Sequence, residues 1–587
     1  MNTAQAMGLA AMLLAALAAR GREVYVDYEG GSDDADGLTP QTPFKHCPGD
    51  AAAAGKAKAL ALAAGDRAIF KGGVEYRSVV TIPWSGAEGQ PIVYDGNTAG
   101  GFGTGMAIVQ CGEPVGGWKK VASADEVRGH PNWERLYVTT LDKARGFFTF
   151  SLYEGATYLN CAQDPDPEIP FFHDRLKNYR NTKTATGSSV TDAAYFTQSD
   201  ARFFDGAYVS LHVKPNVLTY RAVSGYEPGT HTLSFKPHGK ETYGGARGHN
   251  YSILNCIHFL NRPGEYWLDE RPDGVRLVLW PHRPGAGGPE GVTISERKNG
   301  FVLQDASHVT IEGFRILQFG GNRAAAIAKS GGLSRGLVIR GNEIARGRTY
   351  PSRSGAILLG DVEHSLIEAN HIHENAYCAG LMLSRFNDST ARRNLLVRNG
   401  STAVDYYDCH RSTLLHNVVR DNLGMHANGL TLYLGCSEIL VEGNEVYGSN
   451  VGLTMQDGKD ITVRNNIFDG NGGLCIGLWS GKPAGQRRHR QQRALRRRAG
   501  LAGGDLRREQ GRLGLHDPEQ HPRRGLGDLP RRHAVGPQPL DAPRAELPRR
   551  EGRRPLRGRP GPDLQRARSG RLPAQAGQPR SGRWRET

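Results

Sequence analysis

The sequence predicts an all-β protein whose main part is a right-handed parallel β-helix solenoid, with an N-terminal cap and an inserted β-rich domain. Three observations lead to this prediction: a repeat of 22–28 residues in the second half, strand-like alternation within each repeat, and no helical periodicity between the strands. A hydrophobic content of 38% with 77 glycines fits a turn-rich β protein and excludes a membrane bundle.

Residues 1–20 predict a signal peptide. The apolar run at 7–19 is too short to span a bilayer and ends in small residues. No Lys or Arg precedes the run, so a buried N-terminal helix is the alternative. We therefore expect a secreted or periplasmic bacterial protein, and no other segment could span a membrane.

Residues 21–118 predict an N-terminal cap and the first coils. The stretch 23–97 begins with the strand EVYVDY, continues with a Gly/Asp loop and an Ala-rich segment, and ends in further short strands. This order resembles the opening of secreted β-helix carbohydrate-active enzymes. A polar cap protects the open edge of a solenoid.

Residues 119–290 predict an inserted β-rich domain. The segments RLYVTTL, AYVSLHV and HTLSFKP are aromatic strands without the repeat seen further along the chain. The exit of this stretch, GEYWLDERPDGVRLVLWP at 264–281, resembles β-helix glycoside hydrolases that carry an inserted β-barrel. That resemblance implies a glycan cleft between the coils and the inserted domain.

Residues 291–482 contain the repeat. Seven segments align on a turn position, and their spacing of 22–28 residues is typical of a solenoid. Each coil has at least two short strands rich in β-branched residues, which favours a parallel β-helix over a leucine-rich repeat. Stacked Asn side chains can hydrogen-bond from coil to coil. The pattern resembles the pectate-lyase-like β-helix superfamily. The turn residues are Phe314, Asn342, Asn370, Asn394, Asn417, Asn444 and Asn466.

A second set of strands alternates with period two and therefore assigns faces. The expected inward stacks are Ile357, Leu381, Val404, Leu430, Leu453 and Ile476, and Leu359, Leu383, Tyr406, Leu432, Met455 and Leu478. The expected outward stacks are Leu358, Met382, Asp405, Thr431, Thr454 and Gly477, and Gly360, Ser384, Tyr407, Tyr433, Gln456 and Trp479. The strand exits carry Asp361, Arg385, Asp408, Leu434, Asp457 and Ser480.

The net charge of +15 belongs to residues 483–587, which hold 27 Arg and 10 acidic residues. The remainder is close to neutral, so we expect no nucleic-acid partner. With suitable codons, a one-base shift in the DNA of 486–495 reads NVVIANNVL, which matches the strand pattern of 461–468. We interpret 483–587 as an out-of-frame tail, with a disordered Arg/Pro/Gly-rich tail as the alternative. Resequencing this region decides between them.

The eight cysteines lie in the body and none forms a CxxC pair, so a zinc or redox site is not indicated. We expect buried, apolar thiols, and a disulfide stays open. The sequence requires no cofactor and assigns no metal; calcium is a candidate only through the resemblance to β-helix lyases. The expected partner is a polysaccharide or oligosaccharide, and the oligomeric state is open.

The densest polar constellation, DYYDCHR at 405–411, predicts the active site. Hydrolysis of a glycan needs two carboxyl groups. Asp361 and Asp408, two coils apart, and Asp405 and Asp408, on one coil, are alternative pairs, although an Asp at a strand exit also fits a turn cap. We expect surface positions for His371 and His373. The candidate catalytic residues are Asp361, Arg385, Asp405, Asp408, His410 and His426, and the candidate substrate-binding residues are Tyr407, Asn428, Tyr433, Gln456, Asp457 and Trp479.

Three functions follow from this constellation. The first is a secreted glycoside hydrolase that uses paired Asp residues. The second is a lyase or C5-epimerase of uronic-acid polymers, in which Arg385, Arg411, His410, His426 and Tyr433 supply the base and the cations. DCHRS at 408–412 resembles the D-P-H motif of β-helix mannuronan epimerases, with Cys409 in place of the Pro. The third is a non-catalytic glycan-binding β-helix.

Overall fold

The computed structural model describes residues 21–479 apart from 142–149, 168–178, 215–216, 238–247, 273, 296, 350–353 and 425. All of these lie within one compact unit, Met1–Glu519. The predicted signal peptide at 1–20, the tail at 483–587 and Ser480 lie outside the described residues. The fold is almost entirely β, with one short α-helix, α2 (Gly55–Ala59), among the described residues.

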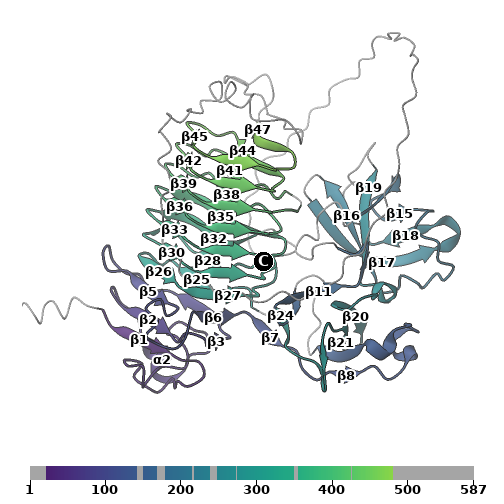
Figure 1. The fold of residues 1–587 in the computed structure, drawn as a ribbon, viewed down its shortest axis with the longest axis horizontal. Coiled ribbons are helices and arrows are strands. Elements are labelled where there is room, and N and C mark those ends of the chain that lie inside the picture. The colour runs from purple at the N-terminus through teal and green to yellow at the C-terminus, as the bar shows by residue number, and fades with distance from the viewer. Residues whose placement is uncertain are drawn as a thin grey trace, which may run out of the picture. The chain divides into compact units, whose positions relative to one another are not determined.

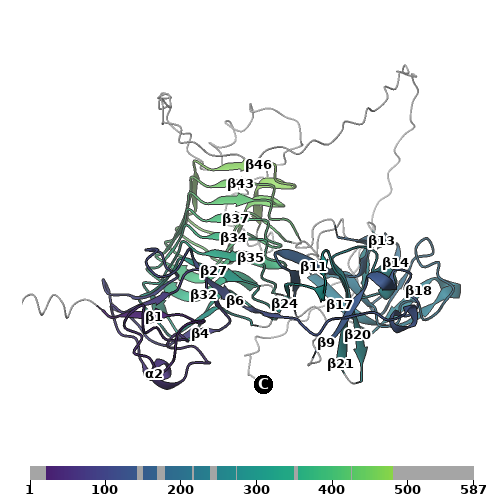
Figure 2. The same cartoon turned by 60° about the horizontal axis from the view of Figure 1, so that its bottom comes forward.

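Three parallel sheets wrap into the predicted solenoid (Figure 1). Sheet 1 contains β1 (Glu23–Val26), β2 (Arg67–Phe70), β5 (Ile92–Asp95), β26 (Val309–Glu312), β30 (Val338–Arg340), β33 (Leu366–Glu368), β36 (Thr390–Arg392), β39 (Thr413–Leu415), β42 (Leu440–Glu442) and β45 (Thr462–Arg464). Sheet 2 contains β4 (Val80–Ile82), β25 (Phe301–Gln304), β28 (Ile327–Ser330), β32 (Ser354–Glu363), β35 (Cys378–Asn387), β38 (Val404–Tyr407), β41 (Leu430–Tyr433), β44 (Val451–Gln456) and β47 (Leu474–Trp479), with β29 (Ser334–Arg335) beside β32. Sheet 3, whose strands are stacked in Figure 2, contains β3 (Glu75–Tyr76), β6 (Ala107–Gln110), β27 (Phe314–Leu317), β31 (Glu343–Ala345), β34 (His371–His373), β37 (Leu395–Val397), β40 (Val418–Arg420), β43 (Glu445–Tyr447) and β46 (Ile467–Asp469).

The inserted strands interrupt the solenoid without breaking its sheets. β5 pairs directly with β26, β4 with β25 and β6 with β27, so the coils before and after the insertion stack on each other. Chain segments more than 200 residues apart therefore share one continuous core.

The inserted strands form two further sheets. One has the order β7 (Gly112–Pro114), β24 (Val292–Ser295), β10 (Leu152–Glu154), β11 (Thr157–Cys161), β20 (Glu265–Arg271), β21 (Gly274–Trp280), β9 (Tyr137–Leu141) and β8 (Lys119–Lys120). The other has the order β12 (Gln163–Asp164), β19 (His249–Leu254), β16 (Tyr208–Lys214), β17 (Val217–Glu227), β18 (Thr232–Phe235), β15 (Ser189–Thr191) and β14 (Thr184–Ala185), with β13 (Arg180–Thr182) beside β19. β22 (Pro284–Gly285) and β23 (Gly288–Pro289) form a small hairpin.

The loop after β31 holds the inserted domain against the coils. Arg348, which is 2% exposed, donates from Nη1 to the Phe150 carbonyl at 3.3 Å and to the Tyr158 hydroxyl at 3.0 Å. The Tyr153 hydroxyl donates to the Arg346 carbonyl at 2.5 Å. Buried hydrogen bonds to a charged group are among the stronger ones, so these contacts anchor the domain.

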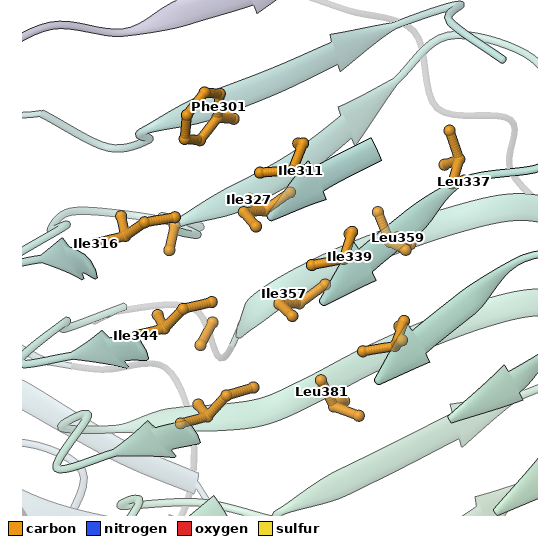
Figure 3. Close-up of a cluster of buried hydrophobic side chains, with 14 of the residues drawn as sticks. Phe301, Ile311, Ile316, Ile327, Leu337, Ile339, Ile344, Ile357, Leu359 and Leu381 are labelled. Carbon is orange, nitrogen blue, oxygen red and sulfur yellow. The ribbon is translucent and has the colours of Figure 1, made fainter. Parts of the chain in front are cut away.

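The interior follows the predicted alternation. The stack Ile357, Leu381, Val404, Leu430, Leu453 is fully buried and in register from coil to coil. Figure 3 shows how such side chains from all three sheets meet inside the coils. Stacking of like residues on adjacent coils fills the core without helices.

The predicted Asn stack is a continuous, buried ladder. Asn342 Nδ2 donates to Asn370 Oδ1, and the same bond repeats through Asn394, Asn417, Asn444 and Asn466, each at 2.9–3.0 Å. At its N-terminal end, the Phe314 backbone N–H donates to Asn342 Oδ1 at 3.0 Å.

Two more ladders escaped the sequence analysis. Asn375, Asn399 and Asn422 bond one another through their side chains at 2.8–3.0 Å. The hydroxyls of Ser365, Ser389 and Ser412 accept from the backbone of the preceding coil. The signal for the first of these was present: an Asn recurs five residues after the turn Asn in several coils.

Candidate active site

The strand-exit positions of sheet 2 all adopt the left-handed backbone conformation. Asp361, Arg385, Asp408, Leu434 and Asp457 have φ between 47° and 55°. Asp tolerates this conformation better than most residues, whereas Arg and Leu do so at a cost. We call this row the exit rail. The turn-forming role of an Asp here is therefore real, and catalysis has to be argued from further contacts.

Arg385 neutralises one of the predicted catalytic carboxylates. It binds Asp361 with two parallel hydrogen bonds, one of them from Nη2 to Oδ2 at 2.7 Å. This hydrogen bonding holds the pKa of Asp361 below its usual value although the group is half-exposed. An acid that must donate a proton needs the opposite shift. The geometry therefore disfavours Asp361 as the acid of a pair with Asp408.

Asp408 and His410 form a different, more exposed pair. His410 Nε2 lies 3.3 Å from Asp408 Oδ1, and the Asp408 side chain is 52% exposed. The other ring nitrogen, Nδ1, lies 2.8 Å from the Ser437 hydroxyl of the next coil. The Asn387 side chain accepts from the His410 backbone at 2.9 Å. His410 is thus oriented by two neighbouring coils and holds a carboxylate that faces solvent.

Asp405 has the predicted register but not the predicted exposure. It pairs with Met382 on one side and Thr431 on the other, in the outward stack. The residue is nevertheless 0% exposed, and Thr431 and Thr454 in the same stack are 0% and 1% exposed. The prediction that an outward register means a solvent-facing side chain is therefore wrong at these coils. Alternation sets the direction of a side chain, whereas burial also depends on what covers the sheet.

An aromatic cluster lies beside Asp405. The rings of Tyr407 and Tyr433 are 5.2 Å apart, and the Tyr433 ring stacks on His426 at 5.9 Å. The Tyr433 hydroxyl is 3.1 Å from His426 Nε2. The loop before β41 is held by the Thr402 hydroxyl, which donates to the His426 carbonyl at 2.6 Å.

The other candidates are placed less closely. Asn428 is 7% exposed, and its backbone carbonyl accepts a hydrogen bond from the Ala403 backbone N–H at 2.9 Å. Gln456 lies beside Trp479 in register, and Trp479 is 47% exposed. Because Gln456 stands between Tyr433 and Trp479 in this stack, Trp479 is not a direct neighbour of the Tyr407–Tyr433 pair. Asp457 continues the exit rail.

Arg411 does not belong to this constellation. Its guanidinium binds Asp388 with two bonds of 2.7 Å, on a separate row of left-handed residues that also contains His364 and Glu438. Adjacency in the sequence was misleading here because the chain turns between Asp408 and Arg411.

A titratable cluster on sheet 3 was missed. His373, expected at the surface, is only 17% exposed and lies between Glu343 at 3.5 Å and Glu374 at 3.7 Å. Its interaction with His373 lowers the pKa of Glu343 to about 2. His371 stacks on His373 with ring centres 4.2 Å apart. The pattern H-x-H-E at 371–374 was visible in the sequence, but it did not indicate which residues of other coils contact these histidines.

A cavity of about 1040 Å³ lies in the inserted domain, away from the candidate site. Two arginines of its lining are held in ion pairs: Arg276 binds Glu126 at 2.5 Å, and Arg271 binds Asp269 at 2.7 Å. These arginines serve the structure of the inserted domain. We therefore place the candidate site on sheet 2.

The described residues contain no group of three or more His, Cys, Asp or Glu that could hold a metal ion. In the same part of the chain, no helix is long and apolar enough to cross a membrane. Calcium stays an untested candidate.

Residues 289–446 match the family model described as "Right handed beta helix region". Comparison with curated proteins finds no match. Among solved structures, a glycoside hydrolase is 12% identical with a TM-score of 0.48, covering 78% of this chain and 96% of that chain. XylC in complex with xylose is 13% identical with a TM-score of 0.43, covering 78% and 67%. A GH136 lacto-N-biosidase from Eubacterium ramulus is 9% identical with a TM-score of 0.28, covering 76% and 55%. The family match and the sheet topology together show that the solenoid of this chain is a right-handed parallel β-helix.

Proposed function

We propose that this chain is a secreted enzyme that cleaves a polysaccharide by hydrolysis, on the outer side of sheet 2 at β38 and β41. One observation carries the proposal: two adjacent coils bring together the carboxyl groups of Asp405 and Asp408, two histidines and two tyrosines. Several other carboxylates of the coils are paired with arginines instead.

Asp408 is the carboxylate that can meet solvent, and His410 orients it. Asp405 is the second carboxyl group, three residues earlier in the chain; its register is outward, and its side chain is covered, at 0% exposed. Successive residues of a strand advance by about 3.3 Å, so the two Cα atoms are at most about 10 Å apart. Tyr407, which is partly exposed, supplies an apolar ring face suited to a sugar, and the buried Tyr433 packs against it.

Arg385 acts in this proposal as a positioning residue. It binds Asp361 directly, and its positive charge also interacts with Asp408.

The test is a product assay on neutral and uronic polysaccharides with the full chain. New reducing ends without ultraviolet absorbance of an unsaturated sugar indicate hydrolysis. Asp405→Asn and Asp408→Asn should each lower kcat by at least about 100-fold, because each removes one of the two carboxyl groups. Asp388→Asn is the matched control. Its carboxylate lies at a turn, as that of Asp408 does, but it belongs to another row and binds Arg411. Full activity of both site variants would refute the assignment.

One observation favours a second candidate, β-elimination or epimerisation of uronic acids. The contact of 3.1 Å between the Tyr433 hydroxyl and His426 is a proton-transfer geometry, and Arg385 supplies a nearby cation. In that case the same assay gives unsaturated products or an altered uronate composition, and Tyr433→Phe is more damaging than Asp405→Asn. Glycan binding without any product identifies a non-catalytic β-helix.

A further inference from the structure

Two cysteines on neighbouring coils occupy equivalent positions next to the candidate site. Cys409 and Cys436 each directly precede a residue of one parallel bridge, His410 and Ser437. The Ser437 backbone N–H donates to the Cys409 carbonyl at 3.0 Å. Equivalent residues on adjacent parallel strands lie about 4.8 Å apart. That spacing falls inside the range of about 4.4–6.8 Å between Cα atoms over which a disulfide closes.

The two thiols are in contact inside the core. Both residues are 0% exposed and free. Cys409 Sγ lies 3.3 Å from the Tyr407 carbonyl, and Cys436 Sγ lies 3.3 Å from the Tyr433 carbonyl, so each thiol is oriented by its own strand exit. A hydrogen bond from the Cys409 thiol lowers the pKa of Cys436, whereas burial raises the pKa of Cys409. The two sulfurs therefore interact directly in the folded core.

We propose that Cys409 and Cys436 form a disulfide between neighbouring coils when the chain folds in the presence of a disulfide oxidant. The Cys436 thiolate attacks the oxidant's disulfide, forms a mixed disulfide and releases one thiolate. Cys409 loses its proton, attacks the Cys436 sulfur and releases the second thiolate. Two protein thiols are oxidised, and one low-molecular-weight disulfide is reduced to two thiols.

Burial determines when the bond forms. An oxidant cannot reach two sulfurs that are 0% exposed, so exchange takes place while the two coils are still loosely packed. Once formed, the bond is equally inaccessible to reductants. The cross-link is therefore structural and persistent.

The cross-link joins the coil of Asp405 and Asp408 to the coil of Tyr433 and His426. His410 and Ser437 already bridge these coils by a hydrogen bond of 2.8 Å, one residue further along. A covalent bond at the adjacent position restricts how far the two coils can separate. This inference stands independently of the proposed function.

The experiment compares full chain produced in a bacterial periplasm with full chain produced in the cytoplasm. Each sample is alkylated in denaturant and digested with trypsin. The peptides 399–411 and 421–459 each contain one cysteine, so their cross-link has a single interpretation. We expect the cross-linked pair in most periplasmic molecules and two alkylated peptides in cytoplasmic ones. The thermal midpoint of the cross-linked form should be higher by about 3–6 °C, because the bond constrains the unfolded chain.

Two variants make the result specific. Cys436→Ser should abolish the difference in midpoint between the two compartments. Cys378→Ser, which removes another buried thiol whose neighbour in register is Ser354, should keep that difference. Complete alkylation of both peptides from folded periplasmic protein overturns the proposal. So does pairing of Cys409 or Cys436 with other cysteines as often as with each other. If Cys436→Ser does not fold, the peptide pairing in the unchanged chain still decides.

Discussion

A carboxylate at a strand exit acquires its role from the one side chain that reaches it. Asp361 and Asp408 occupy the same row, with φ of 55° and 51°. Asp361 binds Arg385, and Asp408 contacts His410. Both side chains are about half exposed, but an arginine neutralises the first carboxylate, whereas a histidine contacts the second. The same residue type at the same backbone position can thus serve structure in one coil and chemistry in another.

The Asn ladder should be the most sensitive set of single residues in the solenoid. Asn394 Oδ1 accepts from the backbone and side chain of Asn370, and its Nδ2 donates to Asn417 and to the Ile367 carbonyl. In Asn394→Ala these buried partners lose their bonds, and each unsatisfied group costs about 1–3 kcal/mol. We expect the free energy of unfolding, measured with denaturant, to fall by about 3 kcal/mol or more.

Arg392→Ala is the control for that measurement. Arg392 lies on the neighbouring strand and forms a half-exposed ion pair with Glu368. Its removal should cost less than about 1 kcal/mol. Equal losses in the two variants would contradict a special role of the ladder.

His373 should make stability depend on pH. Burial alone would lower its pKa, but the nearby carboxylates of Glu343 and Glu374 outweigh this effect and raise the pKa in the fold. A raised pKa means that the protonated form favours folding, so this contribution is complete below about pH 6.5 and is lost as the pH rises through the folded pKa. The groups facing it are Glu343, Glu374 and His371, and the pKa of His371 is shifted the opposite way, by burial.

The measurement is the free energy of unfolding between about pH 5.5 and 8.5 for the unchanged chain and for His373→Gln. The difference in stability between them should shrink as the pH rises, because His373 loses its proton. Both proteins keep His371, so the contribution of His371 cancels in the difference. A difference that grows with pH would reverse the sign of our assignment. Below this window, Glu343 acts in the other direction: its stabilising charge is lost as the pH falls toward its folded pKa of about 2.

At the scale of strands and turns, the exit rail stores backbone strain where a large side chain adopts the left-handed conformation. Leu434 has φ of 52° and is 56% exposed, so it gains little from packing. Asn accepts this conformation more readily. Leu434→Asn should therefore raise the free energy of unfolding by about 0.5–1 kcal/mol. Leu395→Asn, on an exposed strand position of β37, should bring no gain; a gain there as well would indicate a surface effect unrelated to the turn.

Strand order and register could be predicted because both follow from local periodicity. The pairing of Asp405 with Met382 and Thr431 agrees with the sequence prediction residue for residue. Burial of Asp405, the Arg385–Asp361 ion pair and the removal of Arg411 from the site could not be predicted. Each depends on what covers a face of the sheet or on the direction that a long side chain takes. These properties do not produce a periodic pattern in a single sequence.

For the molecule as a whole, the coils should not be equally stable. Ala391 and Leu396 in the middle coils are 0% exposed, whereas their counterparts in the last described coil are less covered: Val463 is 6% exposed and Phe468 is only partly buried. A solenoid is stabilised by contacts between neighbouring repeats, so poorly covered coils open first. Amide hydrogen exchange in β45 and β46 should be faster than in β36 and β37 by more than about tenfold. Uniform protection along the coils would mean that the solenoid opens only as one unit.

The Asn ladder also has a polarity. In every step the amide nitrogen of one coil points to the amide oxygen of the following coil. The distance along the chain between these residues varies from 22 to 28, yet the bond lengths stay the same. Loops can thus grow or shrink between rungs without disturbing the ladder. The ladder therefore fixes the register of neighbouring coils while it leaves the loop lengths between them free to change.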